Sequence, residues 1–134
     1  MHYVYAITTP ASTTFANRQK TILALSRGRI TRVDVQFPSG LQGLAYLVIN
    51  RGLNQLFPTN PDGYYASSAE TIWWPEDYDL STDPFQLEAY TWNLDVVYQH
   101  TITVRVTLEP VTPGASLWET ARQILGLQSG VPSA

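Results

Sequence analysis

The chain lacks cysteine altogether, which excludes disulfides, thiolate metal sites and a cysteine nucleophile. Histidine is almost as scarce, since His2 and His100 offer little material for a histidine-based catalytic triad or a multi-histidine metal site. A glycine-rich phosphate loop is also missing, because Gly40 and Gly43 are followed neither by a Lys-Ser/Thr pair nor by a helical pattern. We therefore expect no catalytic residue, no metal site and no cofactor.

Charged residues are few, at 14% of the chain, against about a quarter in typical soluble domains. Two interpretations remain open. Either a partner covers part of the surface, or the Thr, Ser, Asn and Gln of a β-rich surface replace the missing charges.

Basic residues gather in 18–32 and acidic residues in 62–95, which suits head-to-tail contact between copies or reflects ordinary solvated loops. The net charge of -3 disfavours nucleic acid as a partner.

Long hydrophobic runs are absent as well. No apolar stretch approaches the length of a membrane span, and residues 1–5 lack the basic start and apolar stretch of a signal peptide. We expect a soluble chain, made in the cytoplasm, without a membrane partner. A length of 134 residues suits one domain with a real core and is too short for two ordinary domains.

Two long runs, residues 30–37 and 101–108, alternate between apolar and polar side chains, as half-buried antiparallel strands do. Ile30 is out of phase with the inward set that begins at Val33, which indicates a bulge or the start of the strand. As the first and last long strands, the two runs are expected to lie close in space. The predicted inward residues are Val33, Val35 and Phe37 in the first run and Ile102, Val104, Val106 and Leu108 in the second.

Shorter apolar runs predict further strands at 3–7, 21–25, 44–49, 53–57, 71–74 and 85–92. Ser26-Arg27-Gly28 predicts a turn that joins the strand at 21–25 to the run at 30–37 as a hairpin. Pro75 is expected to close the strand at 71–74. About seven or eight strands, with no helical pattern among them, predict an all-β antiparallel sandwich, with a jelly roll as the expected topology.

The two terminal segments do not follow the β pattern. Residues 8–17 are rich in Thr, Ser, Ala and Pro without periodicity, so we expect an extended arm over 1–20, a sandwich over 21–109, and a linker, helix and tail over 110–134. The helix is predicted from a capping box at Ser116 and Glu119. Its apolar stripe is Leu117, Ala121, Ile124 and Leu125. Because such a short helix is marginal alone, the stripe packs either on its own sandwich or on a partner.

Aromatic side chains crowd into residues 64–92, which hold three of the four Trp and four of the eight Tyr. If these rings are exposed they can stack on sugars, and if they are buried they form core or subunit interface. The candidate platform is Tyr64, Tyr65, Trp73 and Trp74. The acidic residues at 76–79 give only a weak signal for a calcium site, because they lack a calcium-loop spacing. A glycosidase carboxylate pair drawn from Glu76, Asp77, Asp79 and Glu88 is also a weak signal, because spacing along a loop does not give the separation of two carboxylates across a sugar.

Four segments follow one another as a succession of turns and strands: Phe37-Pro38-Ser39-Gly40 with Gly43-Leu44, then Gln55-Leu56-Phe57-Pro58, then Tyr90-Thr91-Trp92-Asn93, and finally the strand at 98–106. Over residues 21–108 this pattern resembles small β-sandwich proteins encoded in tailed-phage structural modules, namely capsid decoration or cement proteins. The terminal segments fall outside the resemblance.

The resemblance implies a non-enzymatic virion protein, assembled in the host cytoplasm, that binds the major capsid protein on the outer face of the shell, commonly as a homotrimer. In this interpretation the terminal segments make the contacts, through Tyr3, Tyr5, Phe15, Leu117, Ala121, Ile124 and Leu125. The alternative is a carbohydrate-binding β-sandwich module of a phage receptor-binding apparatus, with Tyr64, Tyr65, Trp73 and Trp74 as its ligand platform.

Overall fold

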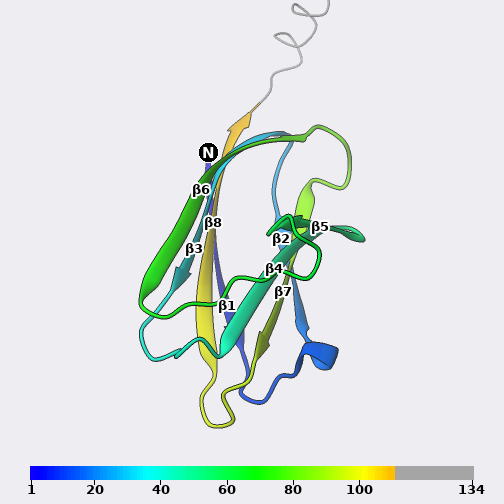
Figure 1. The fold of residues 1–134 in the computed structure, drawn as a ribbon. Helices are drawn as coiled ribbons and strands as arrows, with labels where there is room; N and C mark the ends of the chain where they lie inside the picture. Colours follow the sequence, from blue (N-terminus) through cyan, green and yellow to red (C-terminus); the bar gives the residue numbers. More distant parts are fainter. Residues whose placement is uncertain (111–134) are drawn as a thin grey trace, which may run out of the picture.

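Alternation of inward apolar and outward polar residues builds eight β-strands in the computed structural model, which describes residues 1–110 (Figure 1). A single turn of 3-10 helix, η1 (Phe15–Asn17), precedes the second strand. The strands are β1 (His2–Thr9), β2 (Gln19–Ala24), β3 (Gly28–Phe37), β4 (Ala45–Arg51), β5 (Asn54–Phe57), β6 (Glu70–Leu80), β7 (Gln86–Asn93) and β8 (His100–Pro110).

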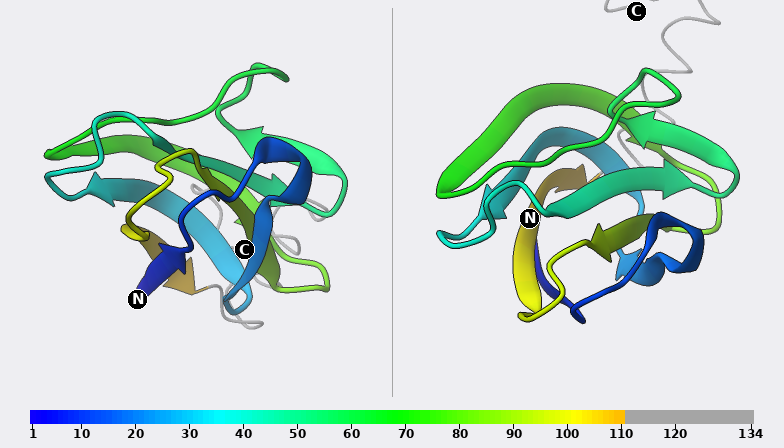
Figure 2. Two further views of the ribbon diagram at one scale, coloured as in Figure 1. Left: turned by 90° about the horizontal axis from the view of Figure 1, so that it is seen from below. Right: turned by 60° about the horizontal axis from the view of Figure 1, so that its bottom comes forward.

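The strands form two four-stranded antiparallel sheets that pack face to face (Figure 2). The first sheet has the order β1-β8-β3-β6, and the second has the order β2-β7-β4-β5. The pairing is nested, because β1 pairs with β8, β2 with β7, β3 with β6 and β4 with β5. Pairs of β3 with β8 and of β4 with β7 complete each sheet. The predicted all-β antiparallel sandwich is therefore confirmed.

The core lies between the two sheets and consists of the inward half of each alternating strand. The first sheet contributes the buried residues predicted for β3 and β8, and the second contributes side chains that alternate along β4 and β7. Removing this apolar surface from water, at about 25 cal/mol per Å², is the main term that offsets the entropy lost on folding. Wholly buried residues include Val33, Val35, Val104 and Val106 from the first sheet and Leu47, Ile49, Leu87 and Ala89 from the second.

Strands β3 and β8 are direct neighbours, as expected for the two long alternating runs. The register of β3 shifts between Ile30 and Arg32 against both β6 and β8. Ile30 is nevertheless wholly buried, because the extra residue returns its side chain to the inward face. The irregularity predicted from the phase of Ile30 is confirmed as a bulge.

Strand β6 continues through Pro75, so the strand limit predicted at 71–74 is wrong. Proline cannot donate a backbone hydrogen bond, but it is tolerated in an edge strand or beside a bulge. Pro75 meets both conditions, since β6 is the last strand of the first sheet and Pro75 lies opposite Arg32 at the bulge.

The extended arm expected over residues 1–20 is corrected by the structure. Strand β1 pairs along its whole length with β8, from His2 opposite Thr107 to Thr9 opposite His100. Its residue Ile7 is buried in the core. The following connection is also attached, because Thr13 forms an isolated bridge with Asn93 of β7. The lack of periodicity at 8–17 therefore reflects the end of β1 and the connection to β2, which is held against β7 and is not a free segment.

The hairpin predicted at Ser26-Arg27-Gly28 is wrong. Strand β2 pairs with β7 in the second sheet, whereas β3 pairs with β6 and β8 in the first. Turn residues specify that the chain changes direction, but they do not specify which sheet it enters.

The predicted C-terminal helix lies outside the described residues, and so do Leu117, Ala121, Ile124 and Leu125. Within residues 1–110, no helix has the length and apolar character that crossing a membrane requires.

Candidate ligand-binding cleft

A cleft of about 410 Å³ opens on the outer face of the second sheet. Along β4, Leu47 and Ile49 face the core, so Tyr46, Val48 and Asn50 point to the opposite side. The rest of the lining comes from the 3-10 turn and the residue after it, from β5 and the loop that follows it, and from β7 and the residue after it. The lining residues are Phe15, Arg18, Tyr46, Val48, Asn50, Gln55, Pro61, Asp62, Gly63, Tyr64, Tyr90, Trp92 and Leu94.

Aromatic rings in mutual contact form the centre of the cleft. Tyr46 and Trp92 lie directly opposite each other on β4 and β7, and their rings stack with centroids 5.3 Å apart at 11°. The ring of Phe15 meets Trp92 edge to face at 5.0 Å. Tyr64 meets Tyr46 in the same way at 5.0 Å. Contacts of this geometry hold each ring in place without a ligand.

The aromatic rings differ in exposure, which gives the cleft a floor and walls. Trp92 is only 6% exposed, whereas Phe15 is 57% and Tyr64 is 53% exposed. The two exposed rings therefore stand over a buried one. This leaves ring faces and edges available to a ligand while the sheet below stays rigid.

The loop that carries Tyr64 is ordered by Gln55. The amide Nε2 of Gln55 donates to the carbonyl oxygens of Pro58 at 2.8 Å, Asn60 at 3.0 Å and Gly63 at 3.3 Å. Reciprocal backbone hydrogen bonds between Leu47 and Tyr65, at 3.0 and 2.9 Å, then tie the end of the loop to β4. Tyr64, between these two anchors, is positioned before any ligand arrives.

The four residues predicted as a sugar platform do not lie together. Tyr64 lines the cleft, but Tyr65 stacks on Trp74 at 5.1 Å and both pack against the core. Burial, helped by the nearby Glu76, raises the pKa of Tyr65 to about 12. Trp73 is 54% exposed on the outer face of the first sheet, where the guanidinium of Arg32 lies 4.1 Å from its ring centroid.

The predicted partner-contact residues also separate. Tyr3 and Tyr5 pack against the core, and their hydroxyls bond to Ser26 Oγ at 2.6 Å and to the carbonyl oxygen of Ala24. Burial, with a smaller effect from Tyr3, raises the pKa of Tyr5 to about 12. Phe15 is the member of this set in the described residues that reaches the cleft.

The sequence interpretation missed Tyr46, because the run at 44–49 was predicted only as a short apolar strand. The available signal was the alternation of Tyr46, Val48 and Asn50 with smaller or aliphatic residues. That signal becomes informative only when β4 is known to pair with β7, which brings Tyr46 opposite Trp92.

A second exposed feature lies in the connection between β7 and β8. We call its residues 94–98 the end loop. Val96 is 77% exposed, and Leu94, Val97 and Tyr98 are also exposed apolar or aromatic residues. The end loop lies at the end of the sandwich opposite the N-terminus (Figure 1).

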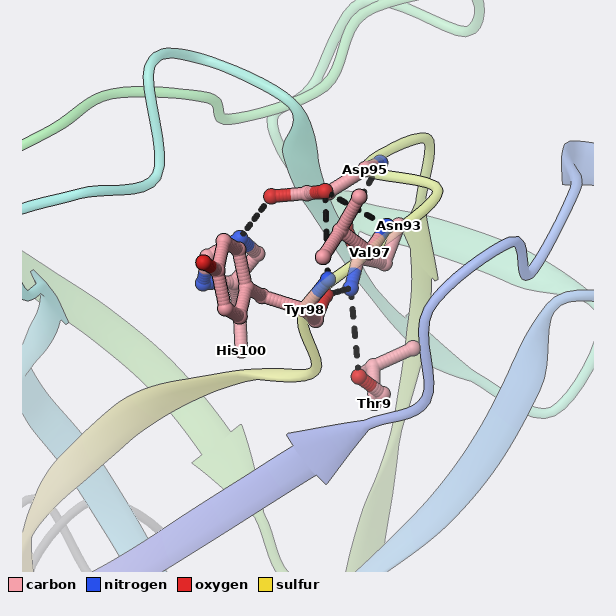
Figure 3. A network of polar contacts seen from close by, with 6 residues as sticks. All are labelled: Thr9, Asn93, Asp95, Val97, Tyr98 and His100. Atoms are coloured by element: carbon pink, nitrogen blue, oxygen red, sulfur yellow. Dashed lines mark hydrogen bonds and ion pairs between the residues drawn. The ribbon is translucent and has the colours of Figure 1, made fainter.

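A polar network, buried at Asn93 and partly exposed at Asp95, holds the end loop in shape (Figure 3). Asp95 Oδ1 accepts hydrogen bonds from the backbone N–H groups of Val97 at 2.9 Å and Tyr98 at 3.2 Å. Its other oxygen, Oδ2, lies 2.8 Å from Nε2 of His100. The bond from Val97, followed by those from His100 and Tyr98, lowers the pKa of the Asp95 carboxyl below its ordinary value.

The acidic residues singled out at 76–79 are engaged with neighbouring side chains on β6, on β3 and just after β6. Glu76 accepts from the indole N–H of Trp74 at 3.0 Å, Asp77 pairs with Arg29, and Asp79 accepts from the hydroxyl of Ser81 at 3.0 Å. Across residues 1–110, no three His, Asp or Glu side chains gather in a way that could hold a metal ion.

Comparison of the chain with protein-family models, with curated protein sequences and with solved structures finds no match.

Proposed function

We propose that the chain is a non-enzymatic jelly-roll binding protein and that its cleft binds carbohydrate. The jelly-roll assignment is supported by eight strands in nested antiparallel pairs, the arrangement that results when one long hairpin is rolled into two sheets. Jelly rolls include lectin domains and viral capsid domains, and a fold does not determine function. The choice of ligand rests on the cleft.

The observation that carries the carbohydrate proposal is that aromatic rings and polar groups line one cleft on the same rigid sheet face. Ring faces pack on the apolar C–H faces of sugars, and hydroxyl groups need nearby donors and acceptors. Tyr64 and Phe15 supply exposed rings, while Asn50 and Asp62 supply polar atoms. The volume of about 410 Å³ suits a small ligand, such as a short oligosaccharide.

Titration of tryptophan fluorescence with a broad panel of glycans tests this proposal. We expect Tyr64→Ala to weaken binding about tenfold, equivalent to about 1.4 kcal/mol, because it removes one stacking ring. Trp73→Ala is the matched control, since Trp73 is equally exposed but lies on the other sheet. A panel without any binder, or equal losses in the two variants, would refute the carbohydrate site.

Capsid decoration is the second candidate, and the end loop is the observation that favours it. Exposed apolar residues on a well-ordered loop are typical of protein contact surfaces. The polar network of Asn93 and Asp95 keeps this loop in one shape, so little entropy would be lost on docking. In this proposal the end loop contacts the major capsid protein on the virion surface, with a homotrimer as the expected assembly.

Binding of the protein to purified capsid shells, measured by sedimentation, tests the decoration proposal. We expect the double change Val96→Ser and Val97→Ser to abolish co-sedimentation without changing the melting temperature, because both side chains are exposed. Val4→Ser, at an exposed position on β1, is the control and should bind as the unaltered protein does. Full co-sedimentation of the double variant would exclude the end loop as the contact.

A further inference from the structure

Arg18 occupies a defined position at one side of the cleft, immediately after η1. Its guanidinium Cζ lies 4.4 Å from the ring centroid of Phe15 and 5.5 Å from that of Tyr90. Its Nη1 donates to the carbonyl oxygen of Phe15 at 3.0 Å. Two aromatic rings and one short-range hydrogen bond therefore hold this side chain, although it is exposed to solvent.

The charge of Arg18 is not neutralised by any carboxylate among residues 1–110. Within that range the ion pairs join Arg29 to Asp77, Arg32 to Asp34 and His100 to Asp95. A guanidinium has five N–H donors, and the structure shows one side-chain hydrogen bond from Arg18. The remaining donors are available to an acceptor that enters the cleft.

One acid lines the cleft together with Arg18. Asp62 belongs to the loop after β5, whereas Arg18 directly precedes β2. The two side chains do not pair with each other, because none of the ion pairs within residues 1–110 joins them. The cleft therefore holds one positive and one negative side chain at separate positions.

From this arrangement we infer that the cleft selects an acidic sugar, with its carboxylate at Arg18 and its uncharged hydroxyl-bearing portion toward Asp62. The inference rests on the proposed carbohydrate function and specifies its substrate class. A planar guanidinium fork matches a carboxylate by two parallel hydrogen bonds. Asp62 repels a second negative charge, so singly acidic oligosaccharides are favoured over polyanionic ones.

The test compares three ligands on the full chain by calorimetry: an oligosaccharide with one terminal uronic or sialic acid, the same molecule with its carboxyl reduced to an alcohol, and a polysulfated oligosaccharide. We expect the carboxylate ligand to bind at least about tenfold more tightly than either of the others. Arg18→Gln should remove the difference between the first two ligands, and Arg18→Lys should retain part of it because the charge remains.

Arg27→Gln is the matched control, because it removes the same charge at the far end of β2 and should leave the preference intact. Asp62→Asn should increase binding of the polysulfated ligand. If the reduced oligosaccharide binds as tightly as the acid, or if Arg18→Gln weakens both equally, the inference is wrong while the carbohydrate site stands. If no member of the set or of a neutral glycan panel binds, the carbohydrate function itself fails.

Discussion

Among single residues, Asn93 is wholly buried although it is polar. Its Nδ2 donates to the carbonyl oxygens of Tyr98 at 2.9 Å and Thr9 at 3.3 Å, and its Oδ1 accepts from the backbone N–H of Asp95 at 3.0 Å. One side chain thus joins β1, β7 and the end loop (Figure 3). A buried polar group of this kind is costly to remove, since its partners lose their hydrogen bonds together.

We expect Asn93→Ala to lower the free energy of unfolding by about 3 kcal/mol, measured by urea denaturation. Asn54→Ala is the control, because Asn54 is exposed on β5 and its loss should have little effect. Equal stability of the Asn93 variant and the unaltered protein would show that water replaces the lost bonds.

Asp95 makes the free energy of unfolding fall at acid pH. Its pKa is lowered in the folded state from an ordinary value of 3.8, so the folded state binds the proton less readily than the unfolded chain. The stabilisation is complete above the ordinary pKa and is lost as pH falls through the lower folded value.

Urea denaturation from pH 7 down to about pH 2 should show this loss in the unaltered protein. In Asp95→Asn the decline below the ordinary pKa should be shallower, because position 95 no longer titrates. Parallel declines in the two proteins would mean that other carboxyl groups carry the acid sensitivity. Asp79→Asn, at the surface of β6, serves as the control and should keep the steep decline.

Among the elements, β3 and β8 depend on close backbone packing where they meet. Gly28 begins β3 opposite Pro110, and a Cβ at this position would lie 2.5 Å from the backbone oxygen of Glu109 and 3.1 Å from Leu108. Backbone atoms in a paired strand cannot move aside as a flexible side chain can. The absence of a side chain is therefore required for this end of the pairing.

We expect Gly28→Ala to reduce the free energy of unfolding by about 1–3 kcal/mol, as overpacking does. Thermal unfolding followed by circular dichroism measures the effect. Arg29→Ala, the exposed neighbour, should change the melting temperature little, since its pair with Asp77 is at the surface. A Gly28 variant as stable as the unaltered protein would mean that β8 shifts to make room.

The strands were predictable from sequence where one face is buried and the other is solvated. The inward set of β8 and the bulge at Ile30 follow directly from period-two alternation. The topology was less accessible, because the turn at Ser26 does not reveal that β2 and β3 enter different sheets. Pro75 led to a wrong strand limit, because a strand accepts proline in its interior when it lies at the edge of a sheet, and the sequence does not show that β6 is an edge strand.

The cleft could be predicted only in part. Tyr64, Tyr90 and Trp92 belong to the aromatic-rich middle of the sequence, but Tyr46 and Arg18 do not. Five residues from four parts of the chain meet because β4 pairs with β7 and η1 packs beside them. These are contacts between distant segments, which a local pattern does not encode.

For the whole molecule, strand β1 is part of the core rather than an addition to it. Its pairing covers one side of β8, and Ile7, Tyr3 and Tyr5 close the sandwich along that side. Without β1, strand β8 would become an exposed edge with an uncovered apolar face.

Deletion of residues 1–10 is expected to abolish the cooperative thermal transition and to promote aggregation, measured by circular dichroism and light scattering. Val4→Ser, an exposed change within the same strand, should unfold as the unaltered protein does. A deletion variant that keeps the molecular mass per particle and the melting temperature expected from the unaltered protein would restore the interpretation of this segment as a free arm.

The two ends of the described chain meet at one end of the sandwich. The amino group of Met1 donates to the carbonyl oxygen of Leu108 at 2.6 Å, and the N–H of Leu108 donates to the carbonyl oxygen of Met1 at 2.7 Å. The end loop lies at the opposite end (Figure 1). Residues 1–110 could therefore be circularly permuted: a short covalent linker would join residue 110 to residue 1, and new termini would be opened in an exposed turn. The nested strand pairs would stay intact.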